Sequence, residues 1–177
     1  SCAPITWYAS LGVPPGVFAV PVMINGTQAA MQIDTGADYG GLYGTQADWT
    51  DFEFNKRESA PPWTDKVSLE IAGESLNAKN LFLYSSNTKG EIVGTVGYDN
   101  LRGKILLIDQ SRDLFCFVSP EHSAVKSAAF VSTPVYFNKQ YIPISANGEK
   151  LEGVIFDTGA GIDYVTPDAW SRLTDDT

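Results

Sequence analysis

The sequence has few residues of the kinds that bind metals or act as catalytic bases. Among its 177 residues there is one histidine, His122, and two cysteines, Cys2 and Cys116. A protein zinc site usually takes four ligands, and serine or cysteine hydrolases place a histidine beside their nucleophile. His122 lies in a polar connecting segment, residues 119–123. We therefore expect no metal, no cofactor and no histidine-dependent hydrolase.

Two further absences concern partners. The longest apolar run falls well short of the about 20 residues that a membrane-spanning helix needs. The net charge is −9, the isoelectric point is about 4.4, and Lys56 and Arg57 are the only adjacent basic residues. An acidic chain without a basic patch is a poor ligand for a polyanion. We expect neither a membrane span nor nucleic-acid binding.

The two cysteines leave alternatives open. Cys2 and Cys116 either form one disulfide, in an oxidising compartment, or are both free. Cys2 is also placed where a bacterial lipoprotein carries its lipid-modified N-terminal cysteine.

The clearest positive feature is an internal repeat. Residues 20–26 read Val-Pro-Val-Met-Ile-Asn-Gly, and residues 142–148 read Ile-Pro-Ile-Ser-Ala-Asn-Gly. Asn-Gly is the favoured two-residue hairpin turn, because both residues tolerate positive φ. We therefore predict a β-hairpin in each copy, with Pro21 and Pro143 at a strand edge or strand start. After the second strand, both copies reach Asp-Thr-Gly-Ala.

The rest of the chain is also strand-like. Alternating residues predict strands over 67–71 and 76–84, and a hairpin pairs 104–108 with 114–118. Short helices are predicted only at 99–103 and 167–173, and the polar segment 119–127 reads as a linker. These patterns predict an all-β protein.

The two Asp-Thr-Gly-Ala sequences are the candidate site. An apolar strand delivers each carboxylate, Asp34 or Asp157, and the glycine permits a sharp turn close to it. Where two such loops meet, the carboxylates are too close for both to ionise, so they share a proton. One can then act as general base on a water molecule and the other as general acid toward a carbonyl oxygen. A single Asp-Thr-Gly sequence is common in turns, but two copies within a longer repeat indicate a pair of catalytic carboxylates.

With these motifs the sequence resembles the retropepsin-like aspartic proteases, a family related to pepsin. Residues 33–38, Ile-Asp-Thr-Gly-Ala-Asp, look like the active-site loop of the retroviral-type enzymes. Residues 95–101, Thr-Val-Gly-Tyr-Asp-Asn-Leu, resemble the second signature, a strand that supports that loop and leads into a short helix. The resemblance implies β-barrel lobes and a catalytic pair, Asp34 and Asp157. It also implies supporting loop residues Thr35, Gly36, Ala37, Thr158, Gly159 and Ala160.

The same resemblance suggests a domain organisation. We expect an N-terminal segment (1–16), a first lobe (17–118), a linker (119–130) and the opening portion of a second lobe (131–177). The second lobe as it stands lacks its supporting strand, so we expect the remainder in further residues or in a second chain. Residues 46–65 occupy the place of the family's mobile flap, and their aromatic residues either pack or line substrate pockets. The resemblance and Cys2 together suggest an extracytoplasmic protein of the bacterial periplasm or envelope, with Cys2 as a candidate lipid anchor.

Three functions compete. The leading one is an aspartic endopeptidase that cleaves peptide or protein substrates laid across the cleft. The second is a peptide-binding module that keeps the fold without catalysis. The third, a symmetric dimer pairing two copies of Asp34, would leave the second Asp-Thr-Gly-Ala without a purpose.

Overall fold

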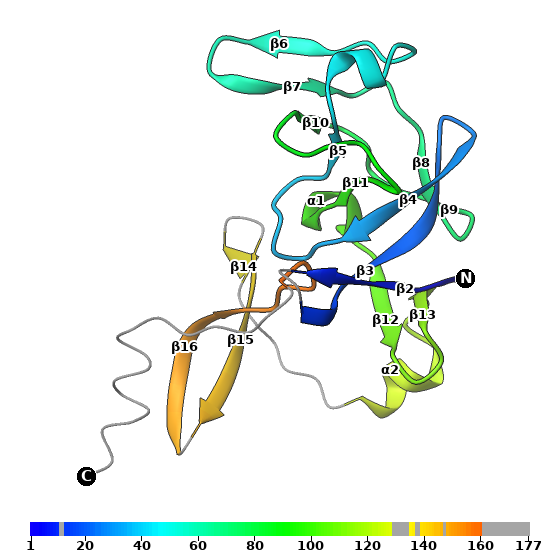
Figure 1. Ribbon diagram of the computed structural model, residues 1–177. Helices are drawn as coiled ribbons and strands as arrows, with labels where there is room; N and C mark the ends of the chain where they lie inside the picture. The colour runs from blue at the N-terminus through cyan, green and yellow to red at the C-terminus, as the bar shows by residue number, and fades with distance from the viewer. Residues whose placement is uncertain (11–12, 129–134, 137–138, 147, 161–177) are drawn as a thin grey trace.

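A computed structural model describes residues 1–10, 13–128, 135–136, 139–146 and 148–160. These residues form three sheets and three short helices, joined by turns and loops. Strands predominate, so the fold is all-β, as predicted (Figure 1). The large sheet has the strand order β6-β7-β10-β5-β11-β4-β3-β8-β9, and β2 also pairs with β3. Its strands are β2 (Thr6–Ser10), β3 (Val13–Ile24), β4 (Thr27–Ile33), β5 (Gly41–Tyr43), β6 (Asn55–Arg57), β7 (Ala60–Thr64), β8 (Leu69–Ile71), β9 (Glu74–Ser75), β10 (Leu81–Tyr84) and β11 (Ile92–Val96).

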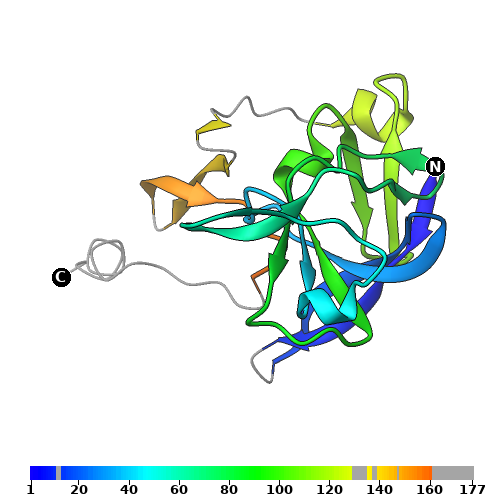
Figure 2. The same ribbon diagram turned by 90° about the horizontal axis from the view of Figure 1, so that it is seen from above.

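Two three-stranded sheets complete the arrangement. The first has the order β1-β13-β12, from β1 (Cys2–Pro4), β13 (Leu114–Val118) and β12 (Ile105–Asp109). The second has the order β14-β15-β16, from β14 (Val135–Tyr136), β15 (Lys139–Ala146) and β16 (Glu149–Ile155). The helices are η1 (Gln46–Asp48), α1 (Tyr98–Leu101) and α2 (Ser123–Ser127). Figure 2 shows the β15–β16 hairpin projecting away from the large sheet.

Alternation along the strands separates a core face from an outer face. Met31, Ile33, Leu42, Leu81 and Val96 are fully buried on the core face. Each such side chain contributes about 1.5–3 kcal/mol by leaving water. The residues between them, such as Gln32, point to the opposite face because side chains alternate along a strand.

Both copies of the repeat form the predicted hairpin. The β3–β4 turn has Asn25 at φ 49° and Gly26 at φ 78°, the positive pair that a tight hairpin turn requires. In the second copy β15 pairs with β16, and Gly148 has φ 81°. Asn147 lies outside the described residues. The repeated sequence therefore gives a repeated local structure.

Pro21 lies where β3 changes partners on one side. Before it β3 pairs with β2 as far as Ala19, and after it β3 pairs with β8 from Met23. On its other side Pro21 faces Ala30 of β4. A proline has no N–H to donate, so it fits a position with a gap in the pairing. The predicted edge character is thus local to one position of a long strand.

The cysteines form a disulfide that joins β1 to β13. Cys2 and Cys116 are register partners and are 114 residues apart in sequence. Of the two alternatives left open by the sequence, the structure has the oxidised one. A lipid anchor on Cys2 would need the same sulfur atom, so the anchor and this disulfide exclude each other. The extracytoplasmic location stays a prediction.

Three other expectations differ from the structure. The predicted strand 76–84 was wrong over 76–80, where Asn80 has φ 58° and Asn77 accepts from Lys79 N at 3.2 Å. The polar segment 119–127 contains α2, which begins with the His122 side chain accepting from Ala124 N. In both segments a side chain hydrogen-bonds to a nearby backbone N–H and favours a turn or a helix start over the predicted structure. The helix predicted at 99–103 is α1, and the one at 167–173 lies outside the described residues.

Candidate active site

The two Asp-Thr-Gly-Ala loops meet face to face. Asp34 directly follows β4, and Asp157 comes shortly after β16. A Cβ atom on Gly36 would overlap the Asp157 carboxylate, and one on Gly159 would overlap the Asp34 carboxylate. The two carboxyl groups themselves share a hydrogen bond. Only glycine permits this approach, because any larger residue would occupy the space of the opposite carboxylate.

The threonines bind the two loops together reciprocally. Thr35 N donates to Thr158 Oγ1 and Thr158 N donates to Thr35 Oγ1, each at 3.1 Å. The hydroxyls then donate onward, from Thr35 to the carbonyl of Phe156 at 2.7 Å and from Thr158 to that of Ile33 at 2.9 Å. The four bonds relate the loops by an approximate two-fold symmetry.

Each loop also holds its own carboxylate. Gly36 N and Ala37 N both donate to Asp34 Oδ1 at 2.9 Å, and Gly159 N donates to Asp157 Oδ1 at 2.8 Å. Ala160 follows as a half-buried residue. All the predicted site residues therefore lie within one small region.

The first loop has additional support from β11 and α1. Asp34 N donates to the Val96 carbonyl at 3.0 Å, and Tyr98 N donates to the Ala37 carbonyl at 2.8 Å. The buried Asn100 accepts from Gly97 N at 2.9 Å and donates to Asn77 O at 2.6 Å. Residues 95–101 thus lie beside the loop, where the resemblance expected a supporting strand and helix.

These surroundings change the proton affinity of one carboxyl group. Burial raises the pKa of Asp34 from 3.8 to about 6, helped by the charge of Asp157 and the hydrogen bond to it. The N–H groups of Ala37 and Gly36 oppose the rise, because they favour the charged form. Burial and the neighbouring acid prevail, so Asp34 holds a proton at mildly acidic pH.

Sequence analysis missed several residues around the loops. Gln32 donates from Nε2 to the Gly159 carbonyl at 3.4 Å, and the Tyr43 hydroxyl is hydrogen-bonded to Thr95 Oγ1. The Tyr84 ring lies against Gly41. The period-two alternation of β4, β5 and β10 places these residues on the face opposite the core. That alternation in the sequence could have indicated that their side chains lie on the same face of the sheet.

The aromatic residues of 46–65 divide into two groups. Trp49 is 7% exposed, donates from Nε1 to the Tyr43 carbonyl at 2.8 Å and packs edge-on against Phe52. Trp63 is half-buried on the β6–β7 hairpin, and the Arg57 guanidinium lies 5.3 Å from its ring centre. The first group packs, and the second is available at the surface.

A groove of about 410 Å³ lies on another side of the loops. It is lined by Thr35 and Phe156 from the two repeats and by β12 residues such as Leu106. No cluster of three acidic, histidine or cysteine residues suited to a metal occurs in the part of the chain that the structure describes. In that same part, no helix has the length and apolarity to cross a membrane.

Known proteins resemble this chain in structure and not in sequence. No family model matches the sequence, and no curated protein matches it significantly. The chain is similar in structure to a retropepsin-like aspartic protease from Rickettsia conorii, with a TM-score of 0.44 and 18% identity. The match covers 66% of this chain and 89% of that one.

Proposed function

We propose that the protein is an aspartic endopeptidase that hydrolyses peptide bonds with Asp34 and Asp157. The observation that carries the proposal is the pair of hydrogen-bonded carboxyls, held together by the reciprocal threonine bonds. Two carboxyl groups that share one proton can give and accept protons within a single step.

The roles follow from the proton distribution. Because its pKa is raised to about 6, Asp34 holds the shared proton and donates it to the carbonyl oxygen of the peptide bond. Asp157 takes a proton from the water whose oxygen bonds to the carbonyl carbon. The resulting diol collapses as the C–N bond breaks, and the protons return to the amine and to the dyad. Atoms and charge balance without a covalent enzyme intermediate.

An assay of peptide hydrolysis between pH 3 and 8 tests the proposal. Wild-type protein should cleave an unstructured protein such as casein, with activity falling as pH rises through about 6. Asp34→Asn and Asp157→Asn each remove one member of the pair, so each should lower kcat by at least about a thousandfold.

Asp113→Asn is the matched control, because it also removes one carboxylate, an exposed one that binds Trp7 Nε1 and is no part of either loop. It should keep wild-type activity. Equal hydrolysis by wild type and Asp34→Asn would reject the endopeptidase and favour a peptide-binding module without catalysis.

A further inference from the structure

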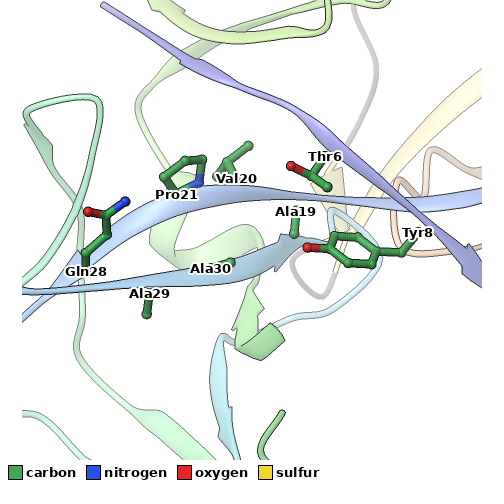
Figure 3. A pocket seen from close by; sticks show the side chains of 8 residues that line it. All are labelled: Thr6, Tyr8, Ala19, Val20, Pro21, Gln28, Ala29 and Ala30. Atoms are coloured by element: carbon green, nitrogen blue, oxygen red, sulfur yellow. The ribbon is translucent and has the colours of Figure 1, made fainter. Parts of the chain in front are cut away.

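The outer face of the large sheet forms a continuous row of residues that leads to the dyad. Six register pairs connect seven strands: Trp63 with Phe82, Phe82 with Gly41, Gly41 with Thr95, Thr95 with Gln32, Gln32 with Ala19, and Ala19 with Thr6. Paired residues in neighbouring strands share a face. At the far end of the row, Ala19 and Thr6 line a hollow of about 380 Å³. Figure 3 shows these side chains among those that line it.

This row borders both catalytic loops. Gln32 stands two residues before Asp34, and its side-chain amide reaches the Gly159 carbonyl of the other loop. The opposite face of the same strands is core, with Leu42 and Leu83 buried. β5 pairs with β11, the strand that supports the Asp34 loop, and the Asp34 charge acts on Tyr84 of β10, so the outer-face residues of β5 and β10 lie beside that loop.

Tyr84 of β10 lies on the outer face beside Gly41 of β5. It is the register partner of Tyr43, and its ring lies so close to Gly41 that a Cβ atom there would overlap the ring carbons. The neighbouring Tyr43 is held by its hydrogen bond to Thr95, so the Tyr84 ring has little room to move that way. Burial, Tyr43 and the carboxylates Asp34 and Asp38 raise the pKa of Tyr84, which agrees with a phenol directed at the site.

We propose that Tyr84 is a specificity-determining residue of the cleft: its ring fills the space over Gly41 and restricts one substrate position beside the scissile bond to small residues. The proposal rests on the proposed endopeptidase function. An extended peptide presents alternate side chains to the walls of its site, so one filled wall restricts one position. The neighbouring aromatics, with Tyr39 packed edge-on against Phe82 at 5.4 Å, lie further along the wall.

Cleavage of a peptide mixture tests this inference. The mixture is randomised at the two residues on each side of the scissile bond, and products are identified by mass spectrometry. Wild-type protein should select Gly, Ala or Ser at one of the four positions. Tyr84→Ala should admit Leu and Phe there, with kcat/KM for these peptides rising about tenfold or more relative to the Ala peptide.

Three variants make the result specific. Tyr84→Val opens the same space and keeps a residue suited to a strand, in case the alanine variant does not fold. Tyr84→Phe keeps the ring and should keep the wild-type profile. Phe82→Ala removes the ring of the Gly41 register partner but leaves the Tyr84 ring over Gly41, so the restricted position should stay restricted.

The outcomes separate the two proposals. If wild type cleaves the mixture through Asp34 but the alanine and valine variants keep its profile at all four positions, the role of Tyr84 is rejected and the endopeptidase stands. If Phe82→Ala relaxes the same position as Tyr84→Ala, the restriction does not belong to Tyr84. If wild type cleaves no better than Asp34→Asn, both proposals fall.

Discussion

The two Asp-Thr-Gly-Ala loops have the same residues and equivalent threonine bonds, but their surroundings differ. Asp34 follows Ile33, which is fully buried, whereas Asp157 follows Phe156, which is 43% exposed. Asp34 is bonded to β11, which runs parallel to β4. Among the residues that the structure describes, no strand supports the second loop in this way. Identical loop chemistry thus occurs in two environments, and burial beside the charge of Asp157 raises the pKa of Asp34.

The motif builds the loop, while the packing around the loop sets how deeply its carboxylate is buried. The internal N–H bonds and the threonine exchange are made by loop residues alone, so they recur in both copies. Burial depends on the layers around each loop, so it does not recur. Substitutions at equivalent positions of the two repeats should therefore change the free energy of unfolding by different amounts.

The largest expected effect concerns the disulfide, whose two cysteines both flank the first repeat. Cys2→Ser with Cys116→Ser should lower the free energy of unfolding by about 4–5 kcal/mol, because a cross-link over 114 residues restricts the unfolded chain. Urea denaturation with and without a reducing agent measures this. The reducing agent should have no effect on the double variant; equal stability of oxidised and reduced wild type would contradict the prediction.

The second prediction compares the residues that precede the two aspartates. Ile33→Ala should cost about 2–5 kcal/mol, since it leaves a cavity in the core. Phe156→Ala removes a larger but more exposed side chain and should cost less than about 1 kcal/mol. Both are measured by urea denaturation. Equal losses of unfolding free energy would show that the two aspartates follow equally well packed residues, and would contradict the difference in burial.

The smallest effect concerns the charge of the dyad. Because the folded-state pKa of Asp34 lies above its unfolded value, the protein gains from its protonation below about pH 4 and loses that gain as pH rises through about 6. Asp34→Asn removes this loss, so it should stabilise the protein at pH 7 by up to about 3 kcal/mol. At pH 3.5 the gain should vanish.

Thermal unfolding of wild type and Asp34→Asn at the two pH values checks this prediction. The same stabilisation at pH 3.5 and at pH 7 would mean that it does not come from removing the charge of Asp34. Asp113→Asn, which removes a carboxylate that binds Trp7 at the exposed surface, serves as the control variant.

Much of the first repeat could be predicted from the sequence. Asn25-Gly26 specified a tight turn by backbone preference, and the alternation of 104–108 and 114–118 predicted a hairpin, which the structure forms from 105–109 and 114–118. The segment 76–80 was mispredicted because Asn77 and Asn80 act through side-chain bonds and positive φ, which apolar alternation does not reveal. At the site, the repeated motif indicated the dyad, whereas Tyr84 and Gly41 become neighbours only when β10 pairs with β5.

The sequence by itself determined the two hairpins, their turns and the chemistry of the loops, because these depend on residues close together in the chain. Only the tertiary structure decided which carboxylate is buried, that the cysteines are paired, and which side chains stand beside Asp34. These features join residues up to 127 positions apart, as in the bond between Gln32 and Gly159. Such contacts depend on how the strands are ordered in the sheets, and local preference does not carry that information.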